Sequence, residues 1–154
     1  MADLVSGRVV ARTLNPSAPM VQRNVPRKVA LDVACGTGQS SRLFGKYFEE
    51  VIGCDVSGTQ ITEAQNTEKI PNITYKVAPA DKLPTERESV SLVTVFQAIH
   101  WFDQQQFFQE AERVLVPGGC LCVCGYAAPL LSYKDKSEKL TDIVNTVRTC
   151  SVCL

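Results

Sequence analysis

The sequence predicts an α/β domain built on a doubly wound, mainly parallel sheet with helices on both faces. Two observations carry this prediction. Five short apolar runs mostly alternate with segments of helical spacing, which is the element order of a parallel sheet. The first run leads into a glycine-containing loop and the second ends in an acidic residue, a pattern typical of the ligand-binding edge of such sheets. A chain of 154 residues, 45% of them hydrophobic, suits a single domain.

The first half of the chain supplies three expected strands, at residues 28–34, 50–55 and 73–78. Each is a compact apolar or alternating run, as expected for a strand of a buried sheet. A helix is expected over 38–48, where apolar residues recur at helical spacing although Gly45 weakens it. A second helix begins after Ser57, a suitable N-cap, and Pro71 ends it.

The second half supplies two more strands, at about 90–97 and 120–126. Between them lies a helix capped by Asp103, and the Pro-Gly-Gly sequence after that helix is expected to turn the chain. The stretch "ADKLPTERE", which leads into the fourth strand, has no clear helical pattern, so a turn or a short helix is expected there. A polar helix at 134–148 follows the fifth strand.

The chain divides into an N-terminal segment, residues 1–27, and a main domain, residues 28–154. Five basic residues and one acid fall within residues 1–28, a composition with a weak likeness to a mitochondrial presequence. The favoured interpretation is a short helix followed by a proline-containing linker from Pro16 to Pro26.

The composition limits the partners and the compartment. Sixteen basic residues balance sixteen acidic ones, which argues against a nucleic-acid partner, and no apolar run approaches the roughly 18 residues of a membrane span. The seven cysteines are an odd number placed mostly in apolar runs, which favours free thiols and a cytoplasmic location. Metal or redox chemistry at Cys150 and Cys153 is the less favoured alternative, so no metal site is expected.

Ligands of such sheets bind beyond the carboxyl ends of the strands, at the point where the strand order reverses. Four segments of the sequence stand at those ends, and the fold should bring them together. They are the loop 34–38, Asp55, Ala80 with Asp81, and the segment 97–101. These segments form the candidate binding site.

The glycine loop leaves several ligands open. Gly36 and Gly38 let a ligand approach the backbone and permit a positive φ, although a simple tight turn would use them equally well. A dinucleotide-binding loop requires a third glycine, and Ser41 stands at that position. Asp55, 17 residues after Gly38, suits a double acceptor for two ribose hydroxyls, and capping of the following helix is its alternative role.

Two further acids are candidates for the site. Asp32 lies inside the first apolar strand, so its carboxylate needs hydrogen bonds from the amides of the glycine loop or from a ligand ammonium group. Asp81 follows the third strand, where it could accept a hydrogen bond from an adenine amino group. Its alternative is a solvated loop acid.

Five segments in order, "LDVACGTGQSS", "VIGCDVS", "APADKLP", "SVSLVTVFQAIHWFD" and "AERVLVPGG", resemble the successive motifs of class I S-adenosylmethionine-dependent methyltransferases. Within that superfamily the chain is most similar to the methyltransferase type 11 group, which includes trans-aconitate methyltransferase. The resemblance covers about residues 28–126. It implies a Rossmann-like sheet with strand order 3-2-1-4-5 and S-adenosyl-L-methionine as the cofactor.

The resemblance also implies a role for each candidate residue. The methionine part of the cofactor would lie on the glycine loop, its ribose on Asp55 and its adenine beside Asp81. His100 and Trp101 would face the methyl acceptor. The implied cofactor-binding residues are Asp32, Ala34, Gly36, Gly38, Asp55, Val56, Ala80, Asp81 and Gln97.

The sequence departs from the family pattern in two ways. Ala34 replaces the first glycine of the loop, while Pro79 and Ser91 stand where acids are frequent, which weakens the expected adenine contact. The family sheet has seven strands and this sequence supplies five, so we expect a C-terminally truncated or spliced domain. Its fifth strand would be an exposed edge, through which an otherwise monomeric chain could dimerise.

The expected reaction is in-line displacement of the sulfonium methyl group by a small-molecule acceptor, helped mainly by proximity and orientation. His100, the one histidine, would position or deprotonate the acceptor, and packing on Trp101 is its alternative role. A catalytically inactive cofactor-binding protein is the second interpretation of the chain. An NAD-dependent oxidoreductase is the third, and Ser41 and the lack of a Tyr-x-x-x-Lys pair argue against it.

Overall fold

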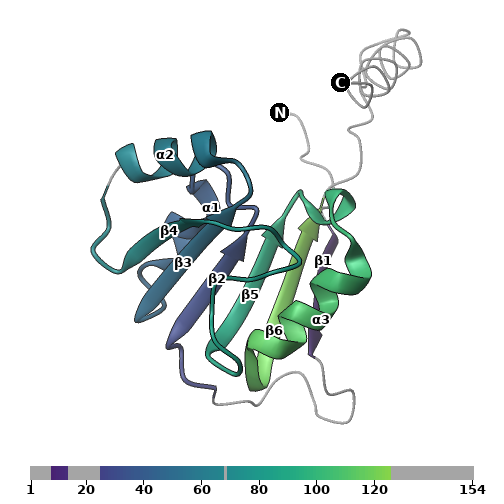
Figure 1. The fold of residues 1–154 in the computed structure, drawn as a ribbon. Helices are drawn as coiled ribbons and strands as arrows, with labels where there is room; N and C mark the ends of the chain where they lie inside the picture. The colour runs from purple at the N-terminus through teal and green to yellow at the C-terminus, as the bar shows by residue number, and fades with distance from the viewer. Residues whose placement is uncertain (1–7, 14–24, 68, 126–154) are drawn as a thin grey trace, which may run out of the picture. The chain divides into compact units, whose positions relative to one another are not determined.

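The computed structural model describes residues 8–13, 25–67 and 69–125. The described strands form one sheet in the order β1-β6-β5-β2-β3-β4 (Figure 1). The strands are β1 Arg8–Thr13, β2 Val29–Val33, β3 Glu50–Asp55, β4 Ile73–Val77, β5 Val90–Phe96 and β6 Leu115–Gly125. The helices are α1 Gln39–Phe44, α2 Gly58–Asn66 and α3 Gln104–Val114, with a 3₁₀ turn, η1, at Ile99–Trp101.

The five strands from β2 to β6 confirm the predicted doubly wound sheet. Strand β2 pairs in parallel with β3 on one side and with β5 on the other. Strand β4 continues the sheet beside β3, and β6 continues it beside β5, both in parallel register. Numbered along the chain from β2, these strands have the order 3-2-1-4-5, which reverses direction between β2 and β5.

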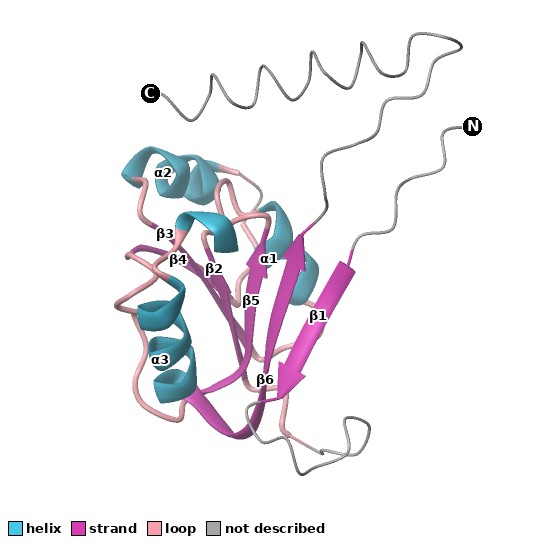
Figure 2. Cartoon of the chain, turned by 90° about the vertical axis from the view of Figure 1, so that its right-hand side faces the viewer, coloured by secondary structure: helices cyan, strands magenta, loops and turns pink. Residues whose placement is uncertain are grey.

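Helices cover both faces of the sheet, because α1 and α3 lie on opposite sides of it in both views (Figures 1 and 2). Helix α3 begins after Asp103, whose carboxylate accepts a hydrogen bond from the Gln106 amide at 3.1 Å, as expected of an N-cap. Its apolar residues Phe107, Ala111 and Val114 are fully buried in the core cluster. They recur at i, i+4 and i+7, which is the stripe expected of a helix packed on a sheet.

Helix α1 is shorter than the sequence predicts, ending at Phe44 instead of continuing to residue 48. The side-chain amide of Asn72 donates hydrogen bonds to the carbonyls of Gly45 and Phe48, both at 2.8 Å, which explains the early end of the helix. A Cβ on Gly45 would lie 3.2 Å from the side chains of Ile70 and Ile73. The chain therefore leaves the helix where the loop before β4 packs closely against it.

The Pro-Gly-Gly sequence lies inside strand β6, whereas the sequence predicts that it turns the chain. Leu115 already pairs with Val90, and the register shifts before Cys120 pairs with Leu92. Gly118 absorbs this irregularity with a φ of 85°, a conformation that favours glycine. The segment is therefore a bulge within a longer strand.

Residues Arg8–Thr13 form strand β1, so the helix predicted for the N-terminal segment is wrong at these residues. Strand β1 lies beside β6 and runs antiparallel to it (Figure 2). A six-residue segment is too short to form a stable helix alone, whereas an open strand edge supplies backbone partners for it. The edge of β6, expected to be exposed, is thus paired, and β4 is the other edge of the described sheet.

Several predictions fall outside the described residues. They are most of the Pro16–Pro26 linker, the helix at 134–148, and the pair Cys150 and Cys153. None of the helices in the described part of the chain has the length and apolar character needed to cross a membrane.

Candidate functional site

A pocket of about 510 Å³ lies beyond the carboxyl ends of β2, β3, β4 and β5. This is the edge of the sheet where the strand order reverses, and where the sequence predicts the site. The lining comes from four loops that are far apart in the sequence. Its residues are Val33, Ala34, Asp55, Val56, Ala78, Pro79, Ala80, Asp81, Phe96, Gln97, Ala98, Trp101, Phe102 and Asp103.

Six of the nine residues expected to bind the cofactor line this pocket, namely Ala34, Asp55, Val56, Ala80, Asp81 and Gln97. The other three, Asp32, Gly36 and Gly38, are not part of its lining. On the acceptor side, Trp101 lines the pocket and His100 does not. The structure thus brings together most of the predicted residues and separates the glycines from the pocket surface.

Sequence reasoning missed five lining residues, most of which are neighbours of predicted ones. Val33 and Phe96 end their strands, and an extension of each predicted segment by one residue would have found them. Asp103 was predicted only as a helix cap. Its position two residues after the segment 97–101 was the available signal. The missed residues are Val33, Ala78, Phe96, Phe102 and Asp103.

Asp55 ends β3 and joins two loops of the site through its carboxylate. Its Oδ2 accepts a hydrogen bond from the Gly36 amide at 3.0 Å, and its Oδ1 accepts one from the Ser57 amide at 2.9 Å. The N-cap of α2 is Ser57 itself, whose Oγ accepts from the Gln60 amide. An ionised carboxylate has about four acceptor positions, so each oxygen of Asp55 has capacity left for a ligand hydroxyl.

The two glycines of the loop are required for different reasons. Both have a positive φ, 55° at Gly36 and 78° at Gly38. A Cβ on Gly38 would lie 2.6 Å from Cζ of Tyr75, whereas one on Gly36 would meet only Oε1 of Gln60, at 3.6 Å. Gly38 is therefore small because the Tyr75 ring packs on it. The amide of Gly36 is the part of the loop that orients Asp55.

Two residues of the pocket have strained backbones. Ala34 has a φ of 55° and Gln97 a φ of 57°, in the left-handed region where residues with a Cβ are rare. They follow the neighbouring strands β2 and β5, and both line the pocket. Strain of this kind costs about 1 to 3 kcal/mol for each residue, and it gathers at binding sites, where the surrounding structure enforces it.

We expect Ala34→Gly to stabilise the protein by about 1 kcal/mol. Glycine removes the cost of the left-handed backbone, about 1 to 2 kcal/mol. The greater backbone entropy of glycine in the unfolded chain offsets less than that. The free energy of unfolding measured by urea denaturation checks this. Ala30→Gly, at a fully buried position inside β2, is the control and should lower stability by about 1 kcal/mol. Equal losses in both variants would contradict the strain at Ala34.

Asp32 is fully buried, and its partners are three hydroxyl groups, not the loop amides or a ligand as the sequence suggested. Its Oδ2 accepts hydrogen bonds from Ser40 at 2.6 Å and Ser41 at 2.7 Å, and its Oδ1 accepts one from Thr94 at 2.8 Å. This explains why Ser41 replaces a third glycine, since its buried hydroxyl has a structural partner. Burial raises the pKa of Asp32 above its ordinary value of 3.8, although the three hydrogen bonds oppose the rise.

We expect Asp32 to make the folded protein less stable as the pH rises. Because its pKa is raised in the folded state, the folded protein keeps this proton at pH values where the unfolded chain has released it. Its contribution is therefore most favourable below about pH 4 and declines as the pH rises through the folded-state pKa. In Asp32→Asn, Tm should no longer fall in this way between about pH 4.5 and about pH 7.

The control for this pH profile is Glu63→Gln, an exposed acid on α2, which should keep the wild-type difference in Tm. Calorimetric melts of the three proteins at both pH values are the measurement. A decline of the same size in Asp32→Asn and wild type would show that Asp32 does not cause it.

His100 and Trp101 lie in η1, directly before α3. The His100 side chain is exposed, and its ring centroid lies 4.8 Å from that of Trp101. Trp101 is 68% exposed and lines the mouth of the pocket. Packing on Trp101, the alternative role of His100, is therefore the arrangement in the structure. His100 does not itself line the pocket, and its connection to the site is its contact with the Trp101 ring.

Ser91, which the resemblance to the family placed near the adenine, lies at the opposite end of β5 from the pocket. Its hydroxyl donates a hydrogen bond to the carbonyl of Pro26 at 2.6 Å. Its substitution for an acid therefore does not change the pocket lining. Pro79 does line the pocket.

The five cysteines in the described residues are free thiols. Cys35, in the glycine loop, and Cys54, in β3, are buried, while the other three lie on β6 and are partly buried. Burial raises the pKa of Cys35 to about 12, which disfavours the reactive thiolate form of this side chain.

Comparison with known proteins gives a consistent match. The family described as "Methyltransferase domain" matches residues 31–123. A Dictyostelium discoideum protein that carries a methyltransferase name is 39% identical over 112 residues, which are 73% of this chain and 41% of that protein. The chain thus spans about two fifths of this relative.

Two solved structures have the same fold. One, from Anaeromyxobacter dehalogenans and described as a type II methyltransferase, is 37% identical with a TM-score of 0.61 and covers 66% of this chain and 42% of that one. The other is an S-adenosylmethionine-dependent methyltransferase from Mesorhizobium loti, 27% identical with a TM-score of 0.59. It covers 66% of this chain and 48% of its own.

Proposed function

Because this chain belongs to the methyltransferase domain family, which matches it over residues 31–123, we propose that it transfers a methyl group from S-adenosylmethionine to a small-molecule acceptor. The class I methyltransferase fold, the enzyme class and the cofactor follow from family membership. The acceptor, the roles of single residues and the domain boundary at residue 28 belong to the proposal.

One observation carries the proposal for the site: Asp55 stands in the pocket with both carboxylate oxygens already oriented by backbone amides. Two oxygens held at a fixed angle suit two adjacent hydroxyl groups of a ribose. A free 2′-hydroxyl is implied, because a 2′-phosphate would be repelled by this carboxylate.

The rest of the pocket fits the remaining parts of the cofactor. Ala78, Ala80 and Phe102 supply an apolar surface of the kind that an adenine ring contacts, and Asp81 stands beside them as an acceptor for its amino group. Ala34 lies on the side proposed for the methionine part. When bound, S-adenosylmethionine supplies an electrophilic methyl group on a sulfonium centre.

The acceptor is proposed to approach along Trp101, whose exposed ring borders the pocket. This ring would orient an acceptor over the reacting methyl group, and orientation is the main demand of in-line displacement. His100, packed against the same ring, is proposed to position the acceptor or to take its proton where one must be lost. A monomeric state and a cytoplasmic location remain predictions.

Calorimetric titration with S-adenosylmethionine, S-adenosylhomocysteine and NAD tests the proposal. We expect both sulfur-containing ligands to bind and to raise Tm, and NAD not to bind. Binding of NAD alone, or of no ligand, would overturn the proposal. Release of S-adenosylhomocysteine in the presence of candidate acceptors then separates an enzyme from the alternative, a cofactor-binding protein without turnover.

A further inference from the structure

We propose that Arg113, held by Glu110, is a positioning residue for the adenine end of the pocket, acting through the loop between β4 and β5. This inference rests on the proposed function, because it concerns how the same pocket is shaped. The loop spans residues 78–89 and contains Ala80 and Asp81, both of which line the pocket.

The loop between β4 and β5 has no helix of its own, unlike the other three connections between β2 and β6. It crosses the sheet as a series of turns, so its position must be set by contacts with another element. Leu83 provides one such contact, because its side chain is 3% exposed and belongs to the core cluster. An apolar side chain alone does not orient the backbone on either side of it.

An ion pair on α3 orients that backbone. Arg113 and Glu110 lie one helical turn apart, and Nε and Nη2 of the guanidinium contact the two carboxylate oxygens at 2.7 and 2.8 Å. This two-point geometry holds both side chains in one plane. Their side chains are 29% and 19% exposed, so solvent only partly screens the pair.

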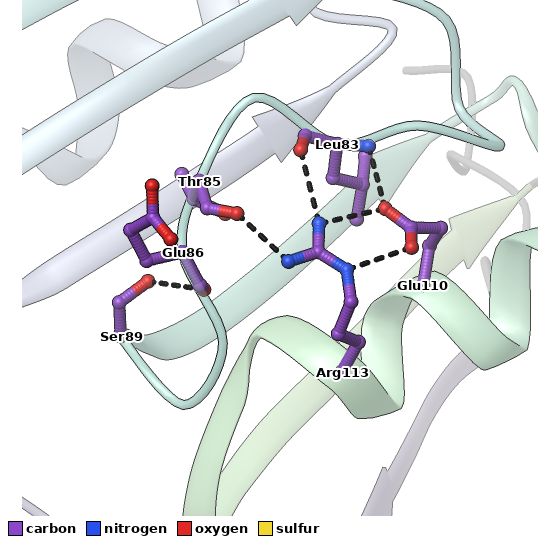
Figure 3. Close-up of polar contacts among 6 residues, drawn as sticks. All are labelled: Leu83, Thr85, Glu86, Ser89, Glu110 and Arg113. Atoms are coloured by element: carbon purple, nitrogen blue, oxygen red, sulfur yellow. Dashed lines mark hydrogen bonds and ion pairs between the residues drawn. The ribbon is translucent and has the colours of Figure 1, made fainter.

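The pair then bonds the loop backbone at three points (Figure 3). Nη2 of Arg113 donates to the carbonyl of Leu83 at 3.1 Å, and Nη1 donates to the carbonyl of Thr85 at 3.0 Å. The amide of Leu83 donates to Oε2 of Glu110 at 2.8 Å. Both peptide groups of Leu83 are thus held by one ion pair, two residues after Asp81.

A partly exposed ion pair by itself contributes little to stability, so its geometry suggests a second role. Here every polar contact beyond the pair itself goes to the loop backbone. Helix α3 also supplies its N-cap, Asp103, to the pocket lining. The N-terminal end of α3 therefore borders the pocket, and its last turn holds the loop that contains Asp81. This arrangement fixes these two sides of the pocket relative to each other before a ligand binds.

The test compares two ligands that differ only at the base: S-adenosylhomocysteine and S-inosylhomocysteine, in which an oxygen replaces the 6-amino group. If Asp81 accepts a hydrogen bond from that amino group, wild type should prefer the adenosyl ligand by about tenfold or more. In Arg113→Gln this preference should fall below about threefold, because the loop no longer holds Asp81 in place. Dissociation constants come from calorimetric titration well below the Tm of each protein.

Two variants make the comparison specific. Arg113→Lys keeps the charge, but a single nitrogen cannot bond Glu110, Leu83 and Thr85 together, so it should lose the preference as Arg113→Gln does. Glu112→Gln changes an exposed acid on the same helix and should keep the wild-type preference. If Arg113→Gln fails to fold, Glu110→Gln takes its place, since it weakens the pair while leaving an acceptor for the Leu83 amide.

The outcomes separate this inference from the proposed function. Failure of wild type to bind either homocysteine ligand overturns the proposed function. A wild type that binds both ligands equally overturns the inference, because Asp81 then does not read the base. A variant that binds more weakly but keeps the tenfold preference also overturns it, because Arg113 then acts only on overall stability.

Discussion

Asp55→Ala is expected to weaken the binding of S-adenosylhomocysteine about 100-fold or more. Hydrogen bonds to a charged group contribute about 1.5 to 3 kcal/mol each, and the carboxylate is placed for two ribose hydroxyls. The substitution also frees the amides of Gly36 and Ser57, which Asp55 holds at 3.0 and 2.9 Å. The glycine loop and the start of α2 would then lose their common anchor. Titration calorimetry measures the dissociation constant directly.

The matched control is Asp103→Asn, which changes another carboxylate of the same pocket lining. Both oxygens of Asp103 accept hydrogen bonds from Gln106, at 3.1 and 2.8 Å, which cap α3, and no part of the proposed cofactor is assigned to this residue. We expect this variant to bind the ligand within about threefold of wild type, although it loses part of the cap. Equal effects of the two substitutions would mean that Asp55 has no special part in ligand binding.

Gly38→Ala is expected to lower the free energy of unfolding by about 3 kcal/mol or more. Left-handed backbone at a φ of 78° costs an alanine about 1 to 2 kcal/mol. The new methyl group would also lie 2.6 Å from Cζ of Tyr75, and a forced shift in a packed region adds about 1 to 3 kcal/mol. The Tyr75 ring also packs on Gly53, where a Cβ would lie 2.6 Å from Cδ1 of that ring, so a shift of the ring would disturb a second contact.

Two comparisons make the Gly38→Ala result specific. Gly58→Ala at the start of α2 has no atom within 4 Å of the new Cβ, so it should leave stability unchanged or raise it by up to about 1 kcal/mol. In Gly38→Ala combined with Tyr75→Val, the steric part should be relieved and the backbone part should remain. Urea denaturation of the four proteins checks this, and a Gly38→Ala protein as stable as wild type would rule out the proposed packing role.

The sequence was sufficient to predict the order of the elements from β2 to β6 and the edge of the sheet where the site lies. Hydrophobic spacing reports which residues are buried, and parallel strands place all their carboxyl ends at one edge. For this reason Asp55, Asp81 and Gln97 could be placed in one pocket from their positions alone. The prediction that these three residues lie together required no knowledge of side-chain geometry.

The identity of each residue's partner was not predictable in the same way. Asp32 was expected to meet loop amides, yet it meets hydroxyls from α1 and from β5, the latter 62 residues along the chain. The edge expected to be open on β6 is paired by β1, whose β-branched residues favour a strand but do not specify the strand with which it pairs. Both outcomes depend on contacts between segments that the local pattern does not relate.

By itself, therefore, the sequence determined the fold class and the location of the site, because these follow from periodic burial and from the geometry common to parallel sheets, while the order of strands β2 to β6 was implied by the resemblance to the family. Only the tertiary structure decided what each small or polar residue does there. Gly38 makes room for Tyr75, Ser41 satisfies a buried carboxylate, and Arg113 holds a loop 28 to 30 residues away. Each of these roles is set by a long-range contact, and long-range contacts exist only once the chain has packed.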